Sequence, residues 1–112
     1  MTIEKLIIKQ QDNIYLIDYD HIVFCQSDNC YTFIHTIEDK KFIAVQSLSK
    51  FAKEQLKKPA FIRVSQSYVI NRNFITSINK KNKTIVLINA QIVPFTVTIR
   101  ELLTLISTVA LT

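Results

Sequence analysis

The sequence predicts an all-β protein of about ten short strands with two short helices. β-branched residues account for 36 of the 112 residues (18 Ile, 8 Val and 10 Thr), and their stiff side chains favour pleated strands. Short apolar runs also alternate with clusters of Asn, Asp, Ser and Lys. Asn and Asp tolerate left-handed backbone geometry, so they are expected at turns in this glycine-free chain.

The first half of the chain predicts five strands and then a helix. The strands are expected at residues 3–8, 14–18, 21–26, 31–37 and 41–45. Apolar residues then recur at spacings of three and four, which predicts a short helix over about 48–57, closed by Pro59. Ser47 and Ser49 are alternative caps for its start.

The second half predicts five more strands and a C-terminal helix. The strands are expected at residues 61–64, 68–71, 74–79, 84–88 and 91–95. Asn71 is interpreted as a turn residue that bonds its own backbone. Thr98 and Glu101 fit a capping box, which predicts a helix over about 99–110. We expect residues 1–112 to form a single domain.

Charge is divided unevenly along the sequence. Residues 1–39 carry two basic and seven acidic residues, for a net charge of −5. Residues 40–100 carry twelve basic residues against Glu54 alone, for a net charge of +11. A positive stretch of this size attracts polyanions such as nucleic acid. A lysine-rich surface that only keeps the protein soluble explains the same charge as well.

The composition argues against most catalytic classes. Without glycine there is no phosphate-binding loop and no dinucleotide fingerprint. His21 and His35 have no third ligand at a zinc spacing, and Cys25 and Cys30 do not form a CxxC pair. Cys25 lies in an apolar run and is interpreted as a small buried hydrophobe, and a Cys25–Cys30 disulfide is disfavoured. We therefore expect no enzyme activity, no metal and no cofactor.

The sequence gives no sign of a membrane or of export. No apolar run approaches the roughly 18 residues that span a bilayer. The N-terminal segment has acidic Glu4 among its first charges and no small-residue cleavage site. We expect a cytoplasmic protein without a membrane partner.

Three stretches of the chain resemble one known family. Residues 21–34 read HIVFCQSDNCYTFI, residues 61–71 read FIRVSQSYVIN, and residues 92–96 read IVPFT. Leu48 and Leu56 match the short helix between the first two stretches. Together they resemble the LytTR family of DNA-binding domains, the output domains of bacterial response regulators, over nearly the whole chain.

The resemblance implies an elongated all-β domain, with its strands in small sheets, that reads DNA with loops whose side chains enter successive major grooves. Carried over by position, the residues implied to reach base edges are Tyr31, Gln66, Thr98 and Arg100. Gln pairs bidentately with adenine and Arg with guanine, which gives Gln66 and Arg100 a physical means of readout. A helix cap explains Thr98 without any DNA contact, and a solvent-facing strand position does the same for Gln66.

Other positions are implied to hold the DNA backbone. The candidates for phosphate contact are Asn29, Lys50, Lys53, Arg63 and Ser65. A solvated helix face explains Lys50 and Lys53 equally well. The family often has basic residues where Gln66 and residues 96–98 stand, so this chain carries less positive charge there than the resemblance leads one to expect.

The leading hypothesis is a sequence-specific DNA-binding domain of a bacterial transcription regulator, with double-stranded DNA as its partner. The alternative is a protein-interaction or dimerisation module on the same fold. It is motivated by an apolar face on the C-terminal helix, formed by Ile99, Leu102, Leu103, Ile106 and Ala110. A homodimer on DNA, and a receiver or sensor domain absent from these 112 residues, are further partners to consider.

Overall fold

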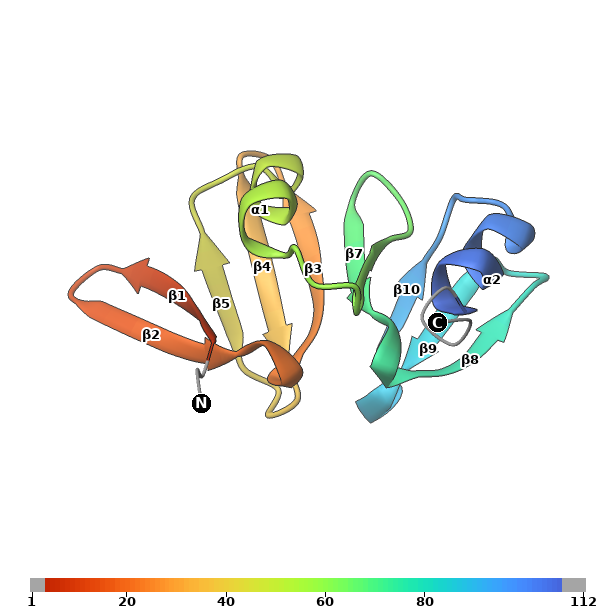
Figure 1. The fold of residues 1–112 in the computed structure, drawn as a ribbon, viewed down its shortest axis with the longest axis horizontal. Helices are drawn as coiled ribbons and strands as arrows, with labels where there is room; N and C mark the ends of the chain where they lie inside the picture. The colour runs from red at the N-terminus through yellow and green to blue at the C-terminus, as the bar shows by residue number, and fades with distance from the viewer. Residues whose placement is uncertain (1–3, 108–112) are drawn as a thin grey trace.

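The computed structural model describes residues 4–107, and it contains three antiparallel sheets arranged in a row (Figure 1). A two-stranded hairpin, a five-stranded sheet and a three-stranded sheet follow one another along a molecule of 44 × 36 × 25 Å. The five-stranded sheet has the order β5-β4-β3-β7-β6, and the three-stranded sheet has the order β10-β9-β8. The all-β prediction is confirmed.

Ten strands and two α-helices occur in the described residues, and every strand boundary lies within two residues of the predicted one. The strands are β1 (Lys5–Gln10), β2 (Asn13–Asp18), β3 (Ile22–Asp28), β4 (Tyr31–Thr36), β5 (Lys41–Ala44), β6 (Phe61–Arg63), β7 (Tyr68–Asn71), β8 (Ile75–Asn79), β9 (Thr84–Leu87) and β10 (Ile92–Pro94). The helices are α1 (Leu48–Gln55) and α2 (Ile99–Ser107), and three single 3₁₀ turns are η1 (Tyr19–His21), η2 (Arg72–Phe74) and η3 (Ile88–Ala90).

Helix α1 is shorter than predicted. Of the two alternative caps, Ser47 is the one used, and its Oγ accepts a hydrogen bond from the backbone N–H of Lys50 (3.3 Å). The helix ends at Gln55 rather than at residue 57, because Leu56 leaves the helical region with φ −109° and ψ 57°. Lys57 therefore lies beyond the helix.

Helix α2 starts where the sequence predicts. The Oγ1 of Thr98 accepts a hydrogen bond from the N–H of Glu101 (3.0 Å), which confirms its interpretation as the cap. The helix is described to Ser107, and the predicted extension to residue 110 lies outside the described residues. Most of its apolar face packs on the chain's own second core: Leu102 is fully buried, and Ile99 and Ile106 are half-buried. Leu103 is 51% exposed, and Ala110 is outside the described residues.

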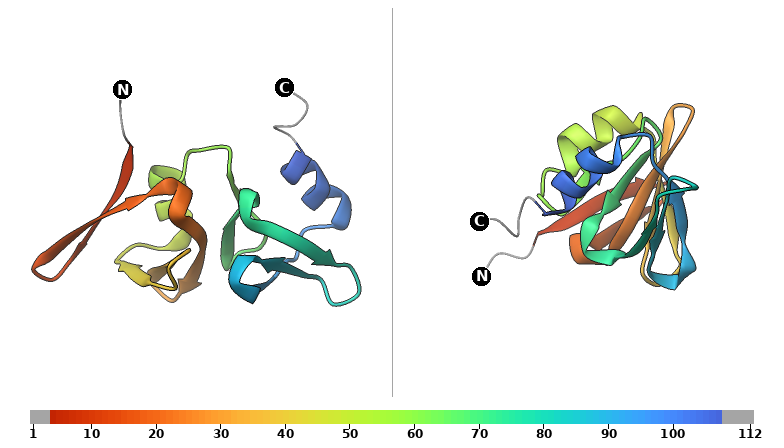
Figure 2. Two further views of the ribbon diagram at one scale, coloured as in Figure 1. Left: turned by 90° about the horizontal axis from the view of Figure 1, so that it is seen from below. Right: turned by 90° about the vertical axis from the view of Figure 1, so that its right-hand side faces the viewer.

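Two apolar cores lie on opposite faces of the central sheet. Side chains alternate along β3 and β7, so that Cys25 and Val69 belong to the first core, and Phe24 and Ile70 to the second. The first core lies between the hairpin, the five-stranded sheet and α1, and the second lies between the five-stranded sheet, the three-stranded sheet and α2 (Figures 1 and 2). Strands β3 and β7 therefore form a wall that both cores share.

A buried amide fixes this wall at one end. Asn71 is 2% exposed, and its Oδ1 accepts a hydrogen bond from the N–H of Asn73 (3.0 Å), which confirms the predicted turn role. Its Nδ2 also donates to the carbonyl oxygen of Ile22 (3.0 Å), a contact that the sequence did not predict. Both polar ends of the side chain are thus satisfied in the interior.

The turns close without glycine. Asn29, Asp39 and Asn89 adopt left-handed φ values of 56°, 59° and 61°, as expected for Asn and Asp. Gln11 and Lys83 also take positive φ values, of 56° and 53°, where the sequence chemistry gave no such indication. A Cβ atom makes this conformation costly, so the surrounding strands must impose it.

Candidate nucleic-acid interface

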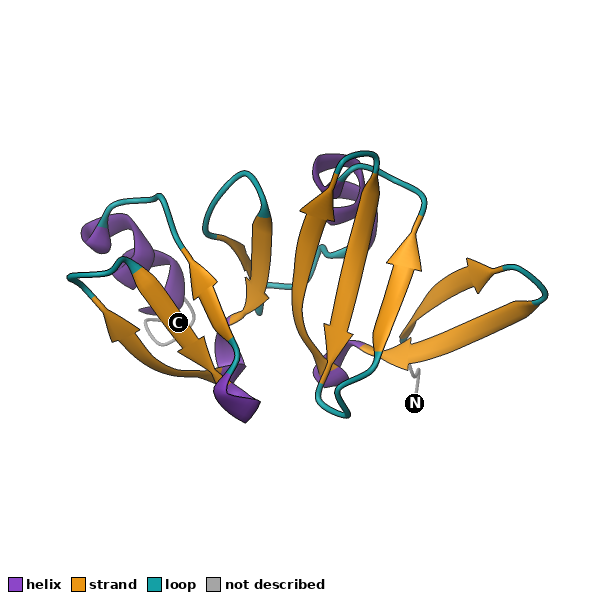
Figure 3. Cartoon of the chain, turned by 180° about the vertical axis from the view of Figure 1, so that it is seen from behind, coloured by secondary structure: helices purple, strands orange, loops and turns teal. Residues whose placement is uncertain are grey.

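Three loops lie along one edge of the molecule. They are the β3–β4 loop (residues 29–30), the β6–β7 loop (residues 64–67) and the β10–α2 loop (residues 95–98), and each follows a different strand of the scaffold. All three stand at the upper edge in Figure 1, and Figure 3 and the right-hand panel of Figure 2 show the same arrangement from other sides. The resemblance assigned DNA reading to these three places, and the fold brings them to one edge.

Backbone hydrogen bonds join strand β3, which leads into the first loop, to the second loop, and the second loop to the third. The N–H of Ser27, at the end of β3, donates to the carbonyl oxygen of Ser67 in the β6–β7 loop (2.9 Å). The carbonyl oxygen of Val64 accepts from the N–H groups of Thr96 (2.9 Å) and Val97 (3.4 Å) in the β10–α2 loop. Main-chain contacts therefore help to set the spacing between the loops.

Arg63 shapes the central loop. Its Nε donates to the carbonyl oxygen of Ser65 (3.0 Å), and its Nη2 donates to that of Gln66 (2.7 Å). Its Nη1 donates to the Oγ of Ser49 at the start of α1 (2.9 Å). The guanidinium thus joins the loop to the helix, and this positioning role is one that the sequence analysis missed.

Ser65 is also engaged within the loop. Its Oγ accepts a hydrogen bond from the N–H of Ser67 (3.1 Å) and its side chain is half-buried. Contact between phosphates and the two predicted residues Arg63 and Ser65 remains a prediction. In the structure both of them determine where Gln66, which is exposed at the tip, is held.

The other base-contact candidates are accessible. Tyr31 is 45% exposed where β4 begins after the first loop. Arg100 is exposed in the first turn of α2, two residues after Thr98. The hydroxyl of Thr98 is an acceptor in the helix cap, and it is exposed at the end of the third loop. Their DNA contacts stay predictions.

The remaining phosphate-contact candidates lie in the first loop and on helix α1. Asn29 is exposed within it in a left-handed conformation. Helix α1 buries Leu48 and Phe51 against the first core, which leaves Lys50 and Lys53 exposed on its outer side. The hydrogen bond from Arg63 to Ser49 places the start of α1 next to the central loop, and phosphate contact by Lys50 and Lys53 stays a prediction.

The three loops themselves contribute no positive charge. Residues 29–30, 64–67 and 95–98 contain neither Lys nor Arg, and Asp28 precedes the first of them. Positive charge near the edge comes from the neighbouring elements, namely Lys50 and Lys53 on α1, Arg63 on β6 and Arg100 on α2. DNA held here would be anchored mainly from beside the loops.

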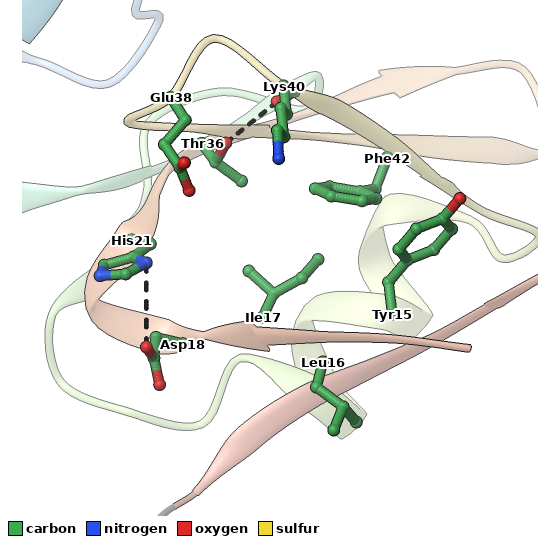
Figure 4. A pocket seen from close by; sticks show the side chains of 9 residues that line it. All are labelled: Tyr15, Leu16, Ile17, Asp18, His21, Thr36, Glu38, Lys40 and Phe42. Atoms are coloured by element: carbon green, nitrogen blue, oxygen red, sulfur yellow. Dashed lines mark hydrogen bonds and ion pairs between the residues drawn. The ribbon is translucent and has the colours of Figure 1, made fainter. Parts of the chain in front are cut away.

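A separate hollow of about 330 Å³ lies away from these loops, between β2, η1 and the β4–β5 connection (Figure 4). Its floor includes Ile17 and Phe42, and its rim carries Glu38 and Lys40. Asp18, also on its wall, bonds Lys5 (2.8 Å), and this hydrogen bond holds the pKa of the carboxyl below its usual value. The ion pair keeps that carboxylate deprotonated, which suits it poorly to proton transfer near neutral pH.

Metal and cysteine chemistry find no support in the part of the chain that the structure describes. Residues 4–107 contain no group of three or more His, Cys, Asp or Glu side chains that could hold a metal ion. Both cysteines are free, with Cys30 exposed. Cys25 is fully buried, as predicted, and burial raises the pKa of its thiol, which keeps it protonated.

A family model described as the LytTr DNA-binding domain matches residues 12–105. The chain belongs to the LytTR family of DNA-binding domains. LytTR is a DNA-binding fold rather than a catalytic one, and the family assignment supports a role as a DNA-binding regulator. No curated protein matches the chain.

A solved structure is similar to this LytTR domain. It is the LytTr DNA-binding domain of a protein from Bacillus cereus described as a methyl-accepting/DNA response regulator. The two share 22% sequence identity with a TM-score of 0.70, over 82% of this chain and 85% of the other. This similarity establishes the fold. Within residues 4–107, no helix is long and apolar enough to cross a membrane.

Proposed function

We propose that this LytTR domain binds double-stranded DNA sequence-specifically, as part of a bacterial transcription regulator, and reads successive major grooves with its three loops. The observation that carries the proposal is the joining of the loops along one edge by the backbone bonds at Ser67 and Val64. Loops held at fixed spacing lose little conformational entropy on binding, which favours a defined register on the duplex. A cytoplasmic location follows from this role.

Base readout is assigned to the exposed side chains in and next to the three loops. Gln66, held at the tip of the central loop, presents an amide that can pair with adenine, and Arg100 presents a guanidinium for guanine. Tyr31 and Thr98 offer hydroxyl groups to a base edge or a phosphate. Asn29, Lys50 and Lys53 contact the sugar-phosphate backbone. Arg63 and Ser65, the other two phosphate candidates, act mainly by holding the central loop in place.

Two substitutions separate these roles. Gln66→Ala should change the preference among promoter fragments, because it removes a base contact while leaving the charge intact. Lys53→Ala should weaken binding to all duplexes alike and lower the slope of log K against log salt by about 0.9, since it removes one phosphate contact. Lys9→Ala is the matched control, because Lys9 is exposed on the distant hairpin.

Fluorescence anisotropy at several salt concentrations, with genomic promoter fragments and an unrelated competitor, measures both effects. Equal losses on every sequence for Gln66→Ala and Lys53→Ala would contradict the assignment of roles. Uniformly weak wild-type binding to all fragments would contradict specific DNA recognition itself.

Dimerisation is the second candidate function, and one surface favours it. The outer face of the β1–β2 hairpin exposes Ile7 (56%), Ile14 (63%) and Leu16 (61%), and Ile7 pairs with Leu16 across the two strands. We propose a second copy of the chain as the occupant, because an apolar face of this kind is self-complementary when two hairpins stack. Sedimentation of the wild type and of Leu16→Glu tests this, and a monomer at all concentrations would rule it out.

A further inference from the structure

One basic segment of the molecule has no place in the three-loop interface. The β8–β9 loop (residues 80–83) reads KKNK and connects two strands of the three-stranded sheet. It lies at the end of the long axis, next to the β10–α2 loop (Figures 1 and 3). Its three lysines are the densest positive charge near an edge whose own loops have none.

The loop is a defined turn. The Oδ1 of Asn79 accepts a hydrogen bond from the N–H of Asn82 (2.9 Å), and Lys83 closes the turn with a φ of 53°. The strands on either side pair in register, with Asn79 opposite Thr84. The side chains of Lys80 and Lys81 thus project from a fixed backbone.

The turn is joined to the third loop of the row. The N–H of Phe95 donates to the carbonyl oxygen of Lys83 (3.1 Å), and the Nζ of Lys83 lies 5.3 Å from the centre of the Phe95 ring. Phe95 is 2% exposed in the second core, so the contact fixes the turn to the scaffold. The bonds at Ser67, Val64 and Lys83 therefore link four loops in one series.

The two lysines at the tip are available to a ligand. Lys80 and Lys81 are exposed, and neither has a hydrogen bond or ion pair with any residue of the described range 4–107. By contrast, Lys5 and Lys58 at the other end of the molecule pair with Asp18 and Glu4, each at 2.8 Å. No acidic residue occurs between Glu54 and Glu101, so no nearby acid in the sequence neutralises the turn.

We propose that the β8–β9 loop is a fourth DNA-contacting element, in which Lys80 and Lys81 bind phosphates of the duplex beyond the β10–α2 loop. This inference rests on the proposed DNA binding and extends its footprint by one loop. The three loops have no basic residues of their own, so the positive charge must come from neighbouring elements, because phosphate neutralisation supplies much of the binding free energy. The β8–β9 loop supplies that charge at the end where α1 does not reach.

The test is the double variant Lys80→Gln/Lys81→Gln, compared with Lys40→Gln/Lys41→Gln. The control also neutralises two adjacent exposed lysines, but these lie at the end of the β4–β5 connection (Lys40) and the start of β5 (Lys41), away from the loops (Figure 4 shows Lys40). Anisotropy with a promoter duplex and an unrelated duplex between 50 and 200 mM salt should show a slope lower by about 1.8 for the first variant. The control should keep the wild-type slope, and both variants should keep the wild-type circular dichroism spectrum.

A second measurement locates the contact. The duplex is shortened stepwise from each end in turn. Shortening from one end only should remove the difference in affinity between the wild type and Lys80→Gln/Lys81→Gln. If the wild type binds DNA and the two double variants have the same slope, the fourth contact is wrong while the three-loop proposal stands. If the wild type binds no duplex, the DNA-binding proposal fails, and this inference fails with it.

Discussion

The two apolar cores of this molecule are built alike, but the surfaces around them differ. Each core uses one face of the β3–β7 wall, one helix and one smaller sheet, and each buries a phenylalanine almost completely, Phe51 in the first and Phe95 in the second. At the hairpin end, acids and lysines neutralise each other, as in the Lys5–Asp18 pair. At the other end, the Lys80–Lys81 turn lies in the part of the sequence between Glu54 and Glu101 that contains no acidic residue.

This difference separates what makes the fold from what gives it function. Burial of apolar side chains imposes the same demand on both sides of the wall, and the sequence meets it with the same residue types. Charge on exposed turns costs the fold little, so it is free to be concentrated where a polyanion would bind. Substitutions in the cores should therefore change folding stability, and substitutions on the surface should change binding.

The largest effect should come from emptying one core at a time. Phe51→Ala and Phe95→Ala should each lower the free energy of unfolding by about 3–5 kcal/mol, through lost burial and the cavity left behind. Because both cores share β3 and β7, we predict one cooperative transition in each variant and in the wild type. Chemical denaturation followed by circular dichroism and by intrinsic tyrosine fluorescence measures this.

Two separate transitions in either variant, or different midpoints from the two probes, would mean that the halves unfold independently and that the chain is not one domain. If an alanine variant does not fold, Phe51→Leu and Phe95→Leu allow the same comparison, because they leave a smaller cavity.

A smaller effect should follow from loosening the central loop without changing its charge. Arg63→Lys should weaken specific DNA binding about tenfold, because one ammonium cannot replace three hydrogen bonds that diverge to Ser49, Ser65 and Gln66. Binding to an unrelated duplex should stay nearly unchanged. Ser49→Ala removes only the bond to α1 and should give a partial loss.

The two duplexes, measured by anisotropy at one salt concentration, distinguish this from direct phosphate contact. If Arg63 acts only through its charge, Arg63→Lys would bind both duplexes like the wild type. If it binds one phosphate bidentately, both duplexes would lose affinity equally.

Much of this arrangement could be predicted from the sequence, for identifiable reasons. The strands follow from the local alternation of apolar runs and turn residues, and the caps at Ser47 and Thr98 follow from local side-chain chemistry. Both can therefore be recognised from neighbouring residues in the sequence. The role of Arg63 was not predictable, because its partner Ser49 is fourteen residues away on another element. The backbone bonds that join the loops carry no side-chain signature, so no residue pattern reveals them.

The smallest effect should be a pH dependence carried by His35, on strand β4, which pairs with β3 of the wall. Its ring stacks on Phe24 at 4.1 Å, its Nε2 is buried without a hydrogen-bond partner in the described range, and burial lowers its pKa, with Lys41 adding to the effect. Below about pH 6.5 the unfolded chain takes up a proton that the folded chain resists, so folding stability should fall as the pH drops. The variant His35→Phe keeps a stacked ring and cannot titrate at this position. Relative to this variant, the free energy of unfolding of the wild type should fall between pH 7 and pH 5 and stay constant above pH 7. The prediction is wrong if the unfolding free energies of the two proteins change in parallel across this pH range. In that case the imidazole of His35 takes up a proton as readily in the sheet as in the unfolded chain, and the structure tolerates a charge next to Phe24.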